Sequence, residues 1–424
     1  MKNNEQKKQV SLAGAARVYE EEKKKSSPWK WIAIGGGLLA LLVIGILLFF
    51  ATDEKDKPSV AARDMVDYFY TPDEVAGDVA YYILGVTGEN VGDPMDMLAV
   101  MCYDRTAGTA SVIQMPVDTY IDKDTGFAVD TLGNVWYNPT PDIFCSACRV
   151  RVPEDDRDGE YHGSCGAKLE ERVGSATGDL IRVMNEQYGL PIDNYLIIPR
   201  QGLVEWIDAM EGIEVELSKK TTLAGESYAK GVHTLSGQAA VEYAVTYNYK
   251  TTPDSDRERM LRQRQVIAAL WQRLSECELK DLYYINDLGS TKGIIGKLMT
   301  GSNPIRFNTT SFGKARLLNI SEEAAADVKL SDAVSQFVWR LTKIELDKVT
   351  FSILPGQSTK TGTLPIYSVN QAQVTELLNQ QMNPYGLTLD ETTVSVPQAI
   401  AKPKEADVAT ASLSEFLPSK EGEE

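Results

Sequence analysis

The sequence predicts an α/β fold, with a central mixed sheet and helices on both of its faces (an αβα sandwich), preceded by one transmembrane helix. Short apolar runs rich in β-branched and aromatic residues alternate with segments whose apolar residues recur at helical spacing, an order typical of a sheet covered on both faces. An uncharged run of about 20 residues, 31–51, has the length that an α-helix needs to cross a bilayer.

The expected domain opens with a strand at 79–86 that ends in a polar turn. Strands at 97–103 and 110–115 are separated by a turn at 104–108, which predicts a hairpin. The later elements follow as helix 175–189 with a terminal glycine, strand 195–198, helix 201–210, strand 213–217, helix 255–278, helix 330–341, strand 349–354 and helix 368–381.

The N-terminus predicts the compartment. Eight basic residues stand against four acidic ones before the apolar run, so the positive-inside rule keeps residues 1–30 in the cytoplasm. A cleaved signal peptide is the alternative, but the charged leader is long and residues 49–52 make a poor cleavage site. We therefore expect a single-pass cell-membrane protein whose main domain is extracellular.

The remaining boundaries follow from composition. A charged and polar stretch at 52–77 is typical of a juxtamembrane linker, and the domain proper is expected over 78–385. Residues 139–166 form a cysteine-containing insertion within it. A tail at 386–424, rich in Glu, Ala, Ser, Pro and Lys, is predicted to be disordered and acidic.

The charge balance excludes one class of partner. The net charge is −17, with +4 on residues 1–30 and −21 on the remainder, whereas a nucleic-acid reader needs a basic face. We therefore expect no nucleic-acid partner. Serine-hydrolase and P-loop readings also fail, because neither G-x-S-x-G nor G-x-x-x-x-G-K-[ST] is present.

Two motifs carry the chemistry. The first runs from Gly231 to Tyr247 and has the form G-x-H-x-L-x-G-x-x-A-x-x-Y, ending in Val245 and Tyr247. The second has the form D-x-x-R-x-x-R-Q and consists of Asp256, Arg259, Arg262 and Gln263. Earlier segments stand in a fixed order before them: 83–87, 94–97, 116–120 and 207–213.

This order of motifs resembles the LytR-CpsA-Psr family of cell-envelope phosphotransferases over about 79–383. The resemblance implies transfer of a glycopolymer phosphate from a polyprenyl pyrophosphate carrier in the membrane to peptidoglycan, with Mg²⁺ and arginines holding the diphosphate. It implies catalytic roles for Asp118 and Arg259, substrate contacts for Arg259, Arg262, Gln263 and Tyr247, and Mg²⁺ binding by Asp96.

The resemblance is incomplete at the charged positions. Thr87 stands at the family's first carboxylate, and the four arginine positions hold Pro94, Val117, Val245 and Tyr247. Each charge-assisted contact is worth roughly 1.5–3 kcal/mol, so a pocket that lacks four of them would bind a bare diphosphate more weakly. Val245 and Tyr247 instead suggest an apolar or sugar-facing surface.

Two interpretations of the surviving residues stay open. Asp256, Arg259 and Gln263 share one helix face, and this face either binds phosphate or is a solvated ion pair. Accordingly, the chain is either a Mg²⁺-dependent glycopolymer phosphotransferase or a non-catalytic scaffold that binds lipid or wall material and regulates active relatives.

The insertion carries a separate signal. Cys145, Cys148, His162 and Cys165 have zinc-like spacing, C-x2-C-x13-H-x2-C. An extracellular compartment favours a disulfide instead, and free thiols are the third alternative. The spacing therefore predicts a possible Zn²⁺ site or a disulfide. The chain's other histidine, His233, is expected to be structural.

Overall fold

The fold is taken from a computed structural model that describes most of the expected extracellular domain. The described residues are 79–88, 93–121, 131–136, 141–145, 147, 152, 157–173, 176–192, 194–246, 255–276, 306–307, 314–315, 318, 320–328, 337, 340, 343–361, 364–384, 386, 389–400 and 403–418. All of them belong to one compact unit, which comprises Asp56–Tyr284 and Gly293–Glu424 apart from the masked stretches between them.

A seven-stranded mixed sheet forms the centre of this unit, with strand order β13-β8-β1-β2-β3-β14-β17. Its strands are β1 (Val79–Thr87), β2 (Met95–Asp104), β3 (Thr109–Gln114), β8 (Asn194–Pro199), β13 (Arg306–Phe307), β14 (Val349–Ile353) and β17 (Ala411–Ser412). β1 runs parallel to β8, and β3 runs parallel to β14. The predicted hairpin is confirmed, because β2 pairs antiparallel with β3.

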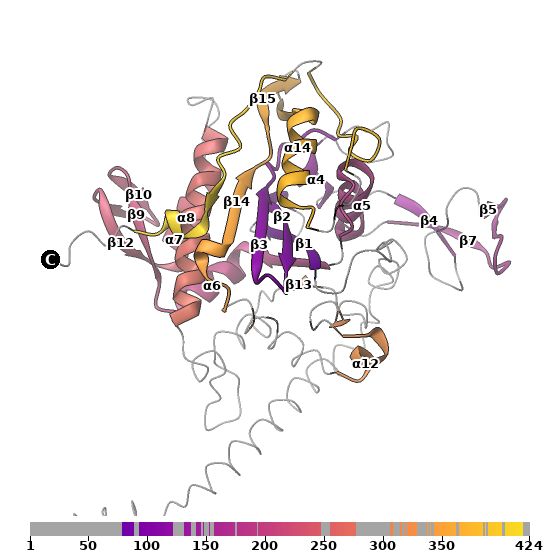
Figure 1. The fold of residues 1–424 in the computed structure, drawn as a ribbon, viewed down its shortest axis with the longest axis horizontal. Helices are drawn as coiled ribbons and strands as arrows, with labels where there is room; N and C mark the ends of the chain where they lie inside the picture. Colours follow the sequence, from indigo (N-terminus) through magenta and orange to yellow (C-terminus); the bar gives the residue numbers. More distant parts are fainter. Residues whose placement is uncertain are drawn as a thin grey trace, which may run out of the picture. The chain divides into compact units, whose positions relative to one another are not determined.

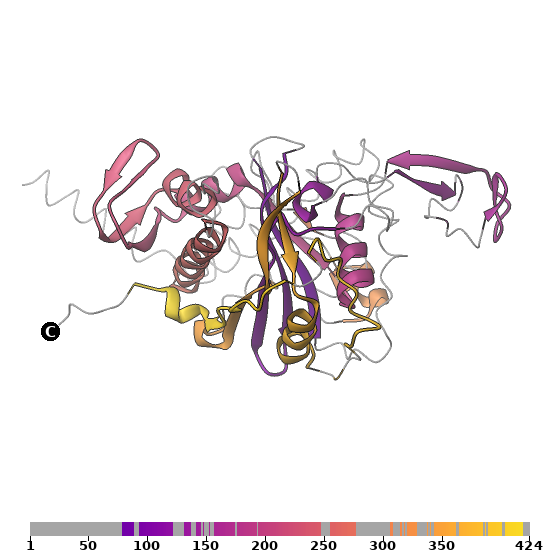
Figure 2. The ribbon, with the colours of Figure 1, turned by 90° about the horizontal axis from the view of Figure 1, so that it is seen from above.

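Helices cover both faces of the sheet (Figures 1 and 2). One face packs against α4 (Leu132–Val135), α5 (Ala176–Tyr188) and α14 (Gln371–Gln381), and the other against α6 (Arg200–Ala209), α7 (Gly237–Val245) and α8 (Ser255–Glu276). Successive strand residues point to opposite faces, so Ile197 enters the first core and Ile198 the second. The predicted fold class is therefore confirmed for the domain.

Most elements fall where the sequence predicts them. The helix expected at 175–189 is α5, and Gly189 follows it with φ 64°, the left-handed residue that ends a helix. The helix expected at 255–278 is α8, and the strand expected at 349–354 is β14. The predicted helix at 330–341 lies largely outside the described residues.

Three pairs of small strands were not fully anticipated. The strand expected at 213–217, β9 (Ile213–Leu217), pairs with β12 (Gly231–Leu235) and not with the central sheet. β10 (Thr221–Leu223) pairs with β11 (Glu226–Tyr228). β15 (Gly356–Thr361) pairs with β16 (Leu364–Val369), so the helix expected to begin at 368 begins only at Gln371, after the N-cap Asn370.

The cysteine-containing insertion forms two more small sheets. β4 (Pro141–Cys145) pairs with β7 (Leu169–Val173), and β5 (Arg157–Asp158) pairs with β6 (Tyr161–His162). Figures 1 and 2 both draw these strands beyond α5, away from the seven-stranded sheet.

The prediction of a disordered tail from residue 386 is wrong for the stretches 389–400 and 403–418. Leu389, Val394 and Val396 are buried in the first core, and β17 adds an edge strand to β14. These apolar residues stand singly among polar ones, so the average composition hides them. A short 3₁₀ helix (Leu413–Phe416) follows β17.

The predicted transmembrane helix at 31–51 lies outside the described residues. Within them, no helix combines the length and apolar character that crossing a membrane requires.

Candidate functional site

The strand ends bring several polar residues to one edge of the sheet. β2 is antiparallel to β1 and β3, and the register sets Met95 opposite Thr87 and Ala99 opposite Gln114. The start of β2 therefore lies at the same edge as the ends of β1 and β3. In α/β sheets, ligands bind at the carboxyl ends of parallel strands, which makes this edge the natural place for a site.

Helix α8 is fixed to this edge by hydrogen bonds. Gln114 Nε2 donates to the backbone oxygen of Met260 at 3.1 Å and to Gln263 Oε1 at 3.3 Å. Gln263 Nε2 in turn donates to the backbone oxygen of Asp96 at 3.4 Å. The structure thus joins two predicted residues, Asp96 and Gln263, that are far apart in sequence.

We define the sheet-edge site by the polar residues that lie on or over this edge: Asp96, Gln114, Asp118, Arg200, Asp256, Arg259 and Gln263.

The electrostatic centre of the site is a pair of carboxyls beside one guanidinium. Arg259 donates to Asp256 Oδ1, and both side chains are buried. Burial, and next the neighbouring Asp256, raise the pKa of Asp118 from 3.8 to about 6, while Arg259 opposes part of the rise. Burial also raises the pKa of Asp256, again opposed by Arg259. The interpretation of Asp256 and Arg259 as a solvated pair is therefore wrong, because both are buried.

The backbone holds Asp118 in place. Its carbonyl oxygen accepts a hydrogen bond from the backbone N–H of Tyr367 at 2.7 Å, and Thr119 forms a bridge with the same residue. Asp118 therefore sits in a turn that is tied to β16, and its carboxyl is positioned beside the first turn of α8.

Asp96 is engaged by an arginine that the motif reading did not single out. Arg200 Nε donates to Asp96 Oδ2 at 2.7 Å, and its Nη2 donates to Oδ1 at 2.6 Å. Both carboxylate oxygens thus face one guanidinium fork. In the sequence, Arg200 only follows a strand and Pro199 at the start of α6, and no motif spacing distinguishes it.

Arg262 contacts the end of the preceding helix. Its Nε donates to the backbone oxygen of Tyr243 at 2.8 Å, its Nη2 donates to the oxygen of Thr246, and the guanidinium lies over the Tyr243 ring at 5.6 Å. A cation at the last carbonyls of α7 satisfies their lone pairs and favours the helix dipole. Arg262 therefore caps the end of α7 in this structure, and its predicted contact with substrate stays a prediction.

Arg264 is among the largest fully buried side chains of the described residues and was not predicted as important. Its Nε donates to Gln114 Oε1 at 2.6 Å and its Nη1 to the backbone oxygen of Ala409. The guanidinium also lies near the rings of Phe351 and Phe416. Burial lowers the pKa of Arg264 to about 10.

Two of the positions where the family has arginine do not face each other across the sheet-edge site. Val117 is buried in the first core, against Gly133, whereas Val245 packs against the second core at the end of α7. Tyr247, the remaining predicted substrate contact, is outside the part of the chain that the structure describes.

The insertion brings three of its four predicted ligands together. Cys145, His162 and Cys165 each offer one ligand atom within 4.8 Å of the others. Cys148, the fourth predicted ligand, is not among the described residues.

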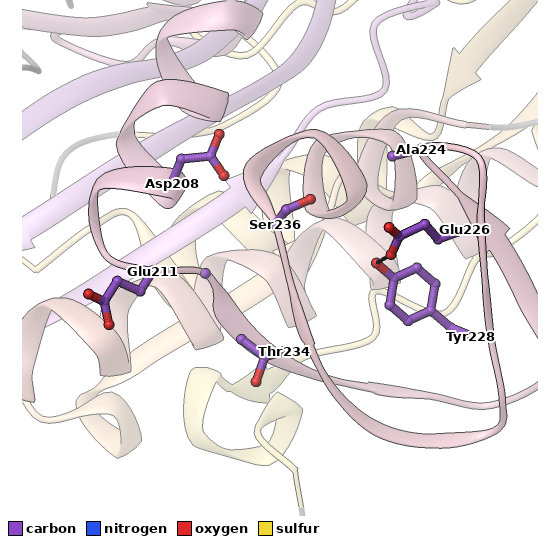
Figure 3. Close-up of a pocket in the computed structure, with 8 residues that line it drawn as sticks. Asp208, Glu211, Ala224, Glu226, Tyr228, Thr234 and Ser236 are labelled. Atoms are coloured by element: carbon purple, nitrogen blue, oxygen red, sulfur yellow. Dashed lines mark hydrogen bonds between the residues drawn. The ribbon is translucent and has the colours of Figure 1, made fainter.

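An open pocket of about 510 Å³ lies elsewhere, between the end of α6 and the β10–β11 hairpin (Figure 3). No predicted site residue lines it. Its wall contains three carboxylates and no basic side chain, so it does not suit a diphosphate. The lining residues are Asp208, Glu211, Gly212, Ala224, Glu226, Tyr228, Thr234 and Ser236.

Comparison with known proteins supports the resemblance read from the motifs. Residues 171–284 match the model of the LytR_cpsA_psr family. This segment includes both α8 and the motif before it, so the predicted resemblance is confirmed there.

Two curated proteins are similar in sequence to part of the chain. "Cell wall biosynthesis protein LcpA" of Corynebacterium glutamicum is 27% identical over 185 residues, which is 43% of this chain and 33% of that protein. "Polyisoprenyl-teichoic acid--peptidoglycan teichoic acid transferase TagU" of Bacillus mycoides is 35% identical over 81 residues, which is 19% of this chain and 26% of that protein. The chain thus spans about a third or less of the length of these relatives.

Among solved structures, the chain is similar to TagT of B. subtilis, with 16% sequence identity and a TM-score of 0.46. The match covers 73% of this chain and 92% of the TagT chain.

Proposed function

Because residues 171–284 carry a LytR_cpsA_psr family segment, we propose that this protein attaches polyprenyl-pyrophosphate-linked glycopolymers to peptidoglycan at the outer face of the cell membrane. Relatives named for cell wall biosynthesis and for teichoic acid transfer support the proposal. The observation that carries it is the sheet-edge site, in which Asp118 has a raised pKa beside the buried Asp256–Arg259 pair.

The proposed roles follow from charge and position. Arg259 and Arg200 supply planar guanidinium forks that suit phosphate oxygens, and Gln263 offers an amide donor between them. Both arginines hold a carboxylate in this structure, so substrate phosphate replaces a carboxylate partner on binding. This exchange costs part of the binding energy.

Asp118 is the proposed general base. A base works best when its pKa lies near the working pH, and a value of about 6 leaves Asp118 ionised at neutral pH and more basic than an ordinary aspartate. The acceptor hydroxyl oxygen attacks the phosphorus that bears the glycopolymer, and Asp118 takes the hydroxyl proton. A new O–P bond forms, the P–O bond to the lipid phosphate breaks, and polyprenyl phosphate leaves.

The predicted Mg²⁺ ligand Asp96 does not fit that role in the arrangement described. Both of its carboxylate oxygens accept hydrogen bonds from Arg200, so a cation there would have to displace the guanidinium. The proposed reaction therefore contains no step that passes through a metal at Asp96.

A transfer assay tests this proposal. The full-length protein in detergent is mixed with glycopolymer labelled on its lipid carrier and with peptidoglycan, with and without Mg²⁺. Asp118→Asn should lower the transfer rate by about 10²–10⁴-fold, the range for loss of a general base. The matched control is Glu258→Gln, which removes an exposed carboxyl from the first turn of α8, near Asp118 but pointing to solvent. Equal rates for the two variants would remove Asp118 from the reaction.

The second candidate is a non-catalytic scaffold that holds lipid-linked or wall material and regulates active relatives. The engagement of Asp96 by Arg200 and of Arg262 by carbonyl oxygens favours it, because neither side chain is then available to substrate. Under this alternative, the full-length protein binds the labelled lipid carrier and transfers nothing at any Mg²⁺ concentration.

The proposed location is tested separately. A reporter enzyme that is active only outside the cytoplasm, fused after Glu424, should be active, because the basic leader is retained inside. Activity of a cytoplasmic reporter at the same position would contradict both candidate functions.

A further inference from the structure

The described residues of the insertion between α4 and α5 bury few apolar side chains. Among its residues whose burial the structure describes, only Cys145, Val152 and His162 are buried. Two of these three carry ligand atoms. Small subdomains with so little buried apolar surface usually depend on a disulfide or a metal to hold their strands.

The ligand atoms of the insertion converge from separate strands. Cys145 ends β4, His162 ends β6, and Cys165 lies in the turn that follows. His162 Nδ1 is 3.1 Å from Cys165 Sγ, and the two sulfur atoms are 3.4 Å apart. Two thiolates on one tetrahedral zinc are about 3.8 Å apart, given a Zn–S distance near 2.3 Å, whereas a disulfide bond measures about 2.03–2.05 Å. The observed spacing is much nearer to the first.

The local backbone presents two ligands from a single tight turn. The N–H of Gly166 donates to the oxygen of His162 at 2.6 Å, and the N–H of His162 donates to the oxygen of Ala167 at 2.8 Å. Gly166 has φ 65°, a backbone conformation that residues other than glycine rarely adopt. Because the turn closes in this way, the side chains of His162 and Cys165 are directed toward the same position.

We propose that the insertion binds one zinc-type divalent cation through Cys145 Sγ, His162 Nδ1 and Cys165 Sγ. Two sulfurs and an imidazole are soft and borderline donors, which select zinc over magnesium or calcium. Two thiolates also balance the charge of the cation. Cys148 is predicted from spacing as the fourth ligand, but the site rests on the three residues that the structure brings together.

The role of this ion is structural. It joins the end of β4 to the β5–β6 hairpin, and these strands lie away from the sheet-edge site. Binding should therefore order the insertion without being required for contacts at α8.

The test measures metal content and coordination in the full-length protein purified in detergent without chelator. Wild type should carry about one zinc per chain by mass spectrometry of the metals. Replacement by Co²⁺ should give the visible absorption bands of a tetrahedral site with thiolate ligands. Both measurements use wild type and so do not depend on any variant folding.

Variants then assign the site. His162→Ala and Cys165→Ser should each lose most of the zinc, whereas His233→Ala should keep it. His233 is the matched control, because it is the chain's only other histidine and its Nε2 hydrogen-bonds with the backbone oxygen of Ala229. Wild type that binds neither zinc nor cobalt would overturn the proposal, as would a Cys145–Cys165 disulfide found by peptide mass mapping.

Discussion

Two arginines on α8, Arg259 and Arg264, are five residues apart but lie in different environments. Arg259 lies at the sheet-edge site, where it faces one buried carboxylate and influences a second, Asp118. Arg264 lies under the C-terminal tail, where Gln114, a backbone oxygen and two aromatic rings surround it. The first region has more carboxyl than cation, and the second surrounds its cation with an amide oxygen, a backbone oxygen and aromatic rings.

The difference teaches that a charged motif cannot be read by residue type alone. Both arginines are buried on one helix, yet only Arg259 has an environment whose electrostatic balance a phosphate would change. Arg264 instead joins α8 to the tail, which also supplies Asp407 to Arg257. We therefore assign binding to the first region and stability to the second.

The largest expected effect is the loss of stability when Arg264, under the C-terminal tail, is replaced. Arg264→Ala removes a large buried side chain, leaves Gln114 Oε1 without its donor and detaches Ala409, so we expect a loss of about 3–5 kcal/mol in the free energy of unfolding. Urea denaturation followed by tryptophan fluorescence measures it.

Arg257→Ala is the control for that prediction. Its ion pair with Asp407 is exposed, so its loss should cost no more than about 1 kcal/mol. Equal losses for the two variants would mean that the tail, and not burial of Arg264, sets the stability of this region.

The next effect has the opposite sign and belongs to the sheet-edge site. The folded state raises the pKa of Asp118 from 3.8 to about 6, so it favours the protonated carboxyl. The resulting stability is fully present below pH 3.8 and is lost as the pH rises through about 6. Asp118→Asn cannot ionise and should therefore be more stable than wild type at pH 7.5, by on the order of 1–3 kcal/mol.

The pH dependence distinguishes this gain from a packing effect. The advantage of Asp118→Asn should shrink as the pH falls from 6 toward 4, because wild type then becomes protonated. Glu258→Gln, measured beside it, should show no such change in relative stability. A gain for Asp118→Asn that is the same at pH 4.5 and 7.5 would contradict the ionisation account.

The smallest of these effects concerns Arg200. Its fork to Asp96 is partly exposed, so Arg200→Ala should lower the free energy of unfolding by about 1 kcal/mol or less, with less effect at high salt. A loss above about 3 kcal/mol would instead mark this pair as a structural contact like that of Arg264.

The sequence predicts the framework of the molecule better than its contacts. Apolar runs located β1, β2 and β3, and apolar residues at helical spacing located α5 and α8. The β15–β16 hairpin and the ordered tail were missed, since their apolar residues are few and are buried by residues distant in sequence. Local pattern carries no information about such partners.

The candidate site shows the same limit. Motif order identified Asp118, Arg259 and Gln263, which the structure brings to one edge. Arg200 and Gln114 were missed, because an arginine after a strand and a glutamine within one have no special spacing. The substrate contact predicted for Arg262 stays a prediction, and its contact with the last carbonyls of α7 depends on the packing of α7 on α8, which no local spacing indicates.

The most direct test of the central claim is the affinity of the full-length protein for a polyprenyl pyrophosphate, measured by calorimetry in detergent for Arg259→Gln and Arg257→Gln. Loss of a charge-assisted contact costs about 1.5–3 kcal/mol, so Arg259→Gln should raise the Kd by about tenfold or more, while Arg257→Gln should leave it within about twofold. Equal affinities for both variants and wild type, in folded protein, would contradict the assignment of diphosphate binding to the sheet-edge site.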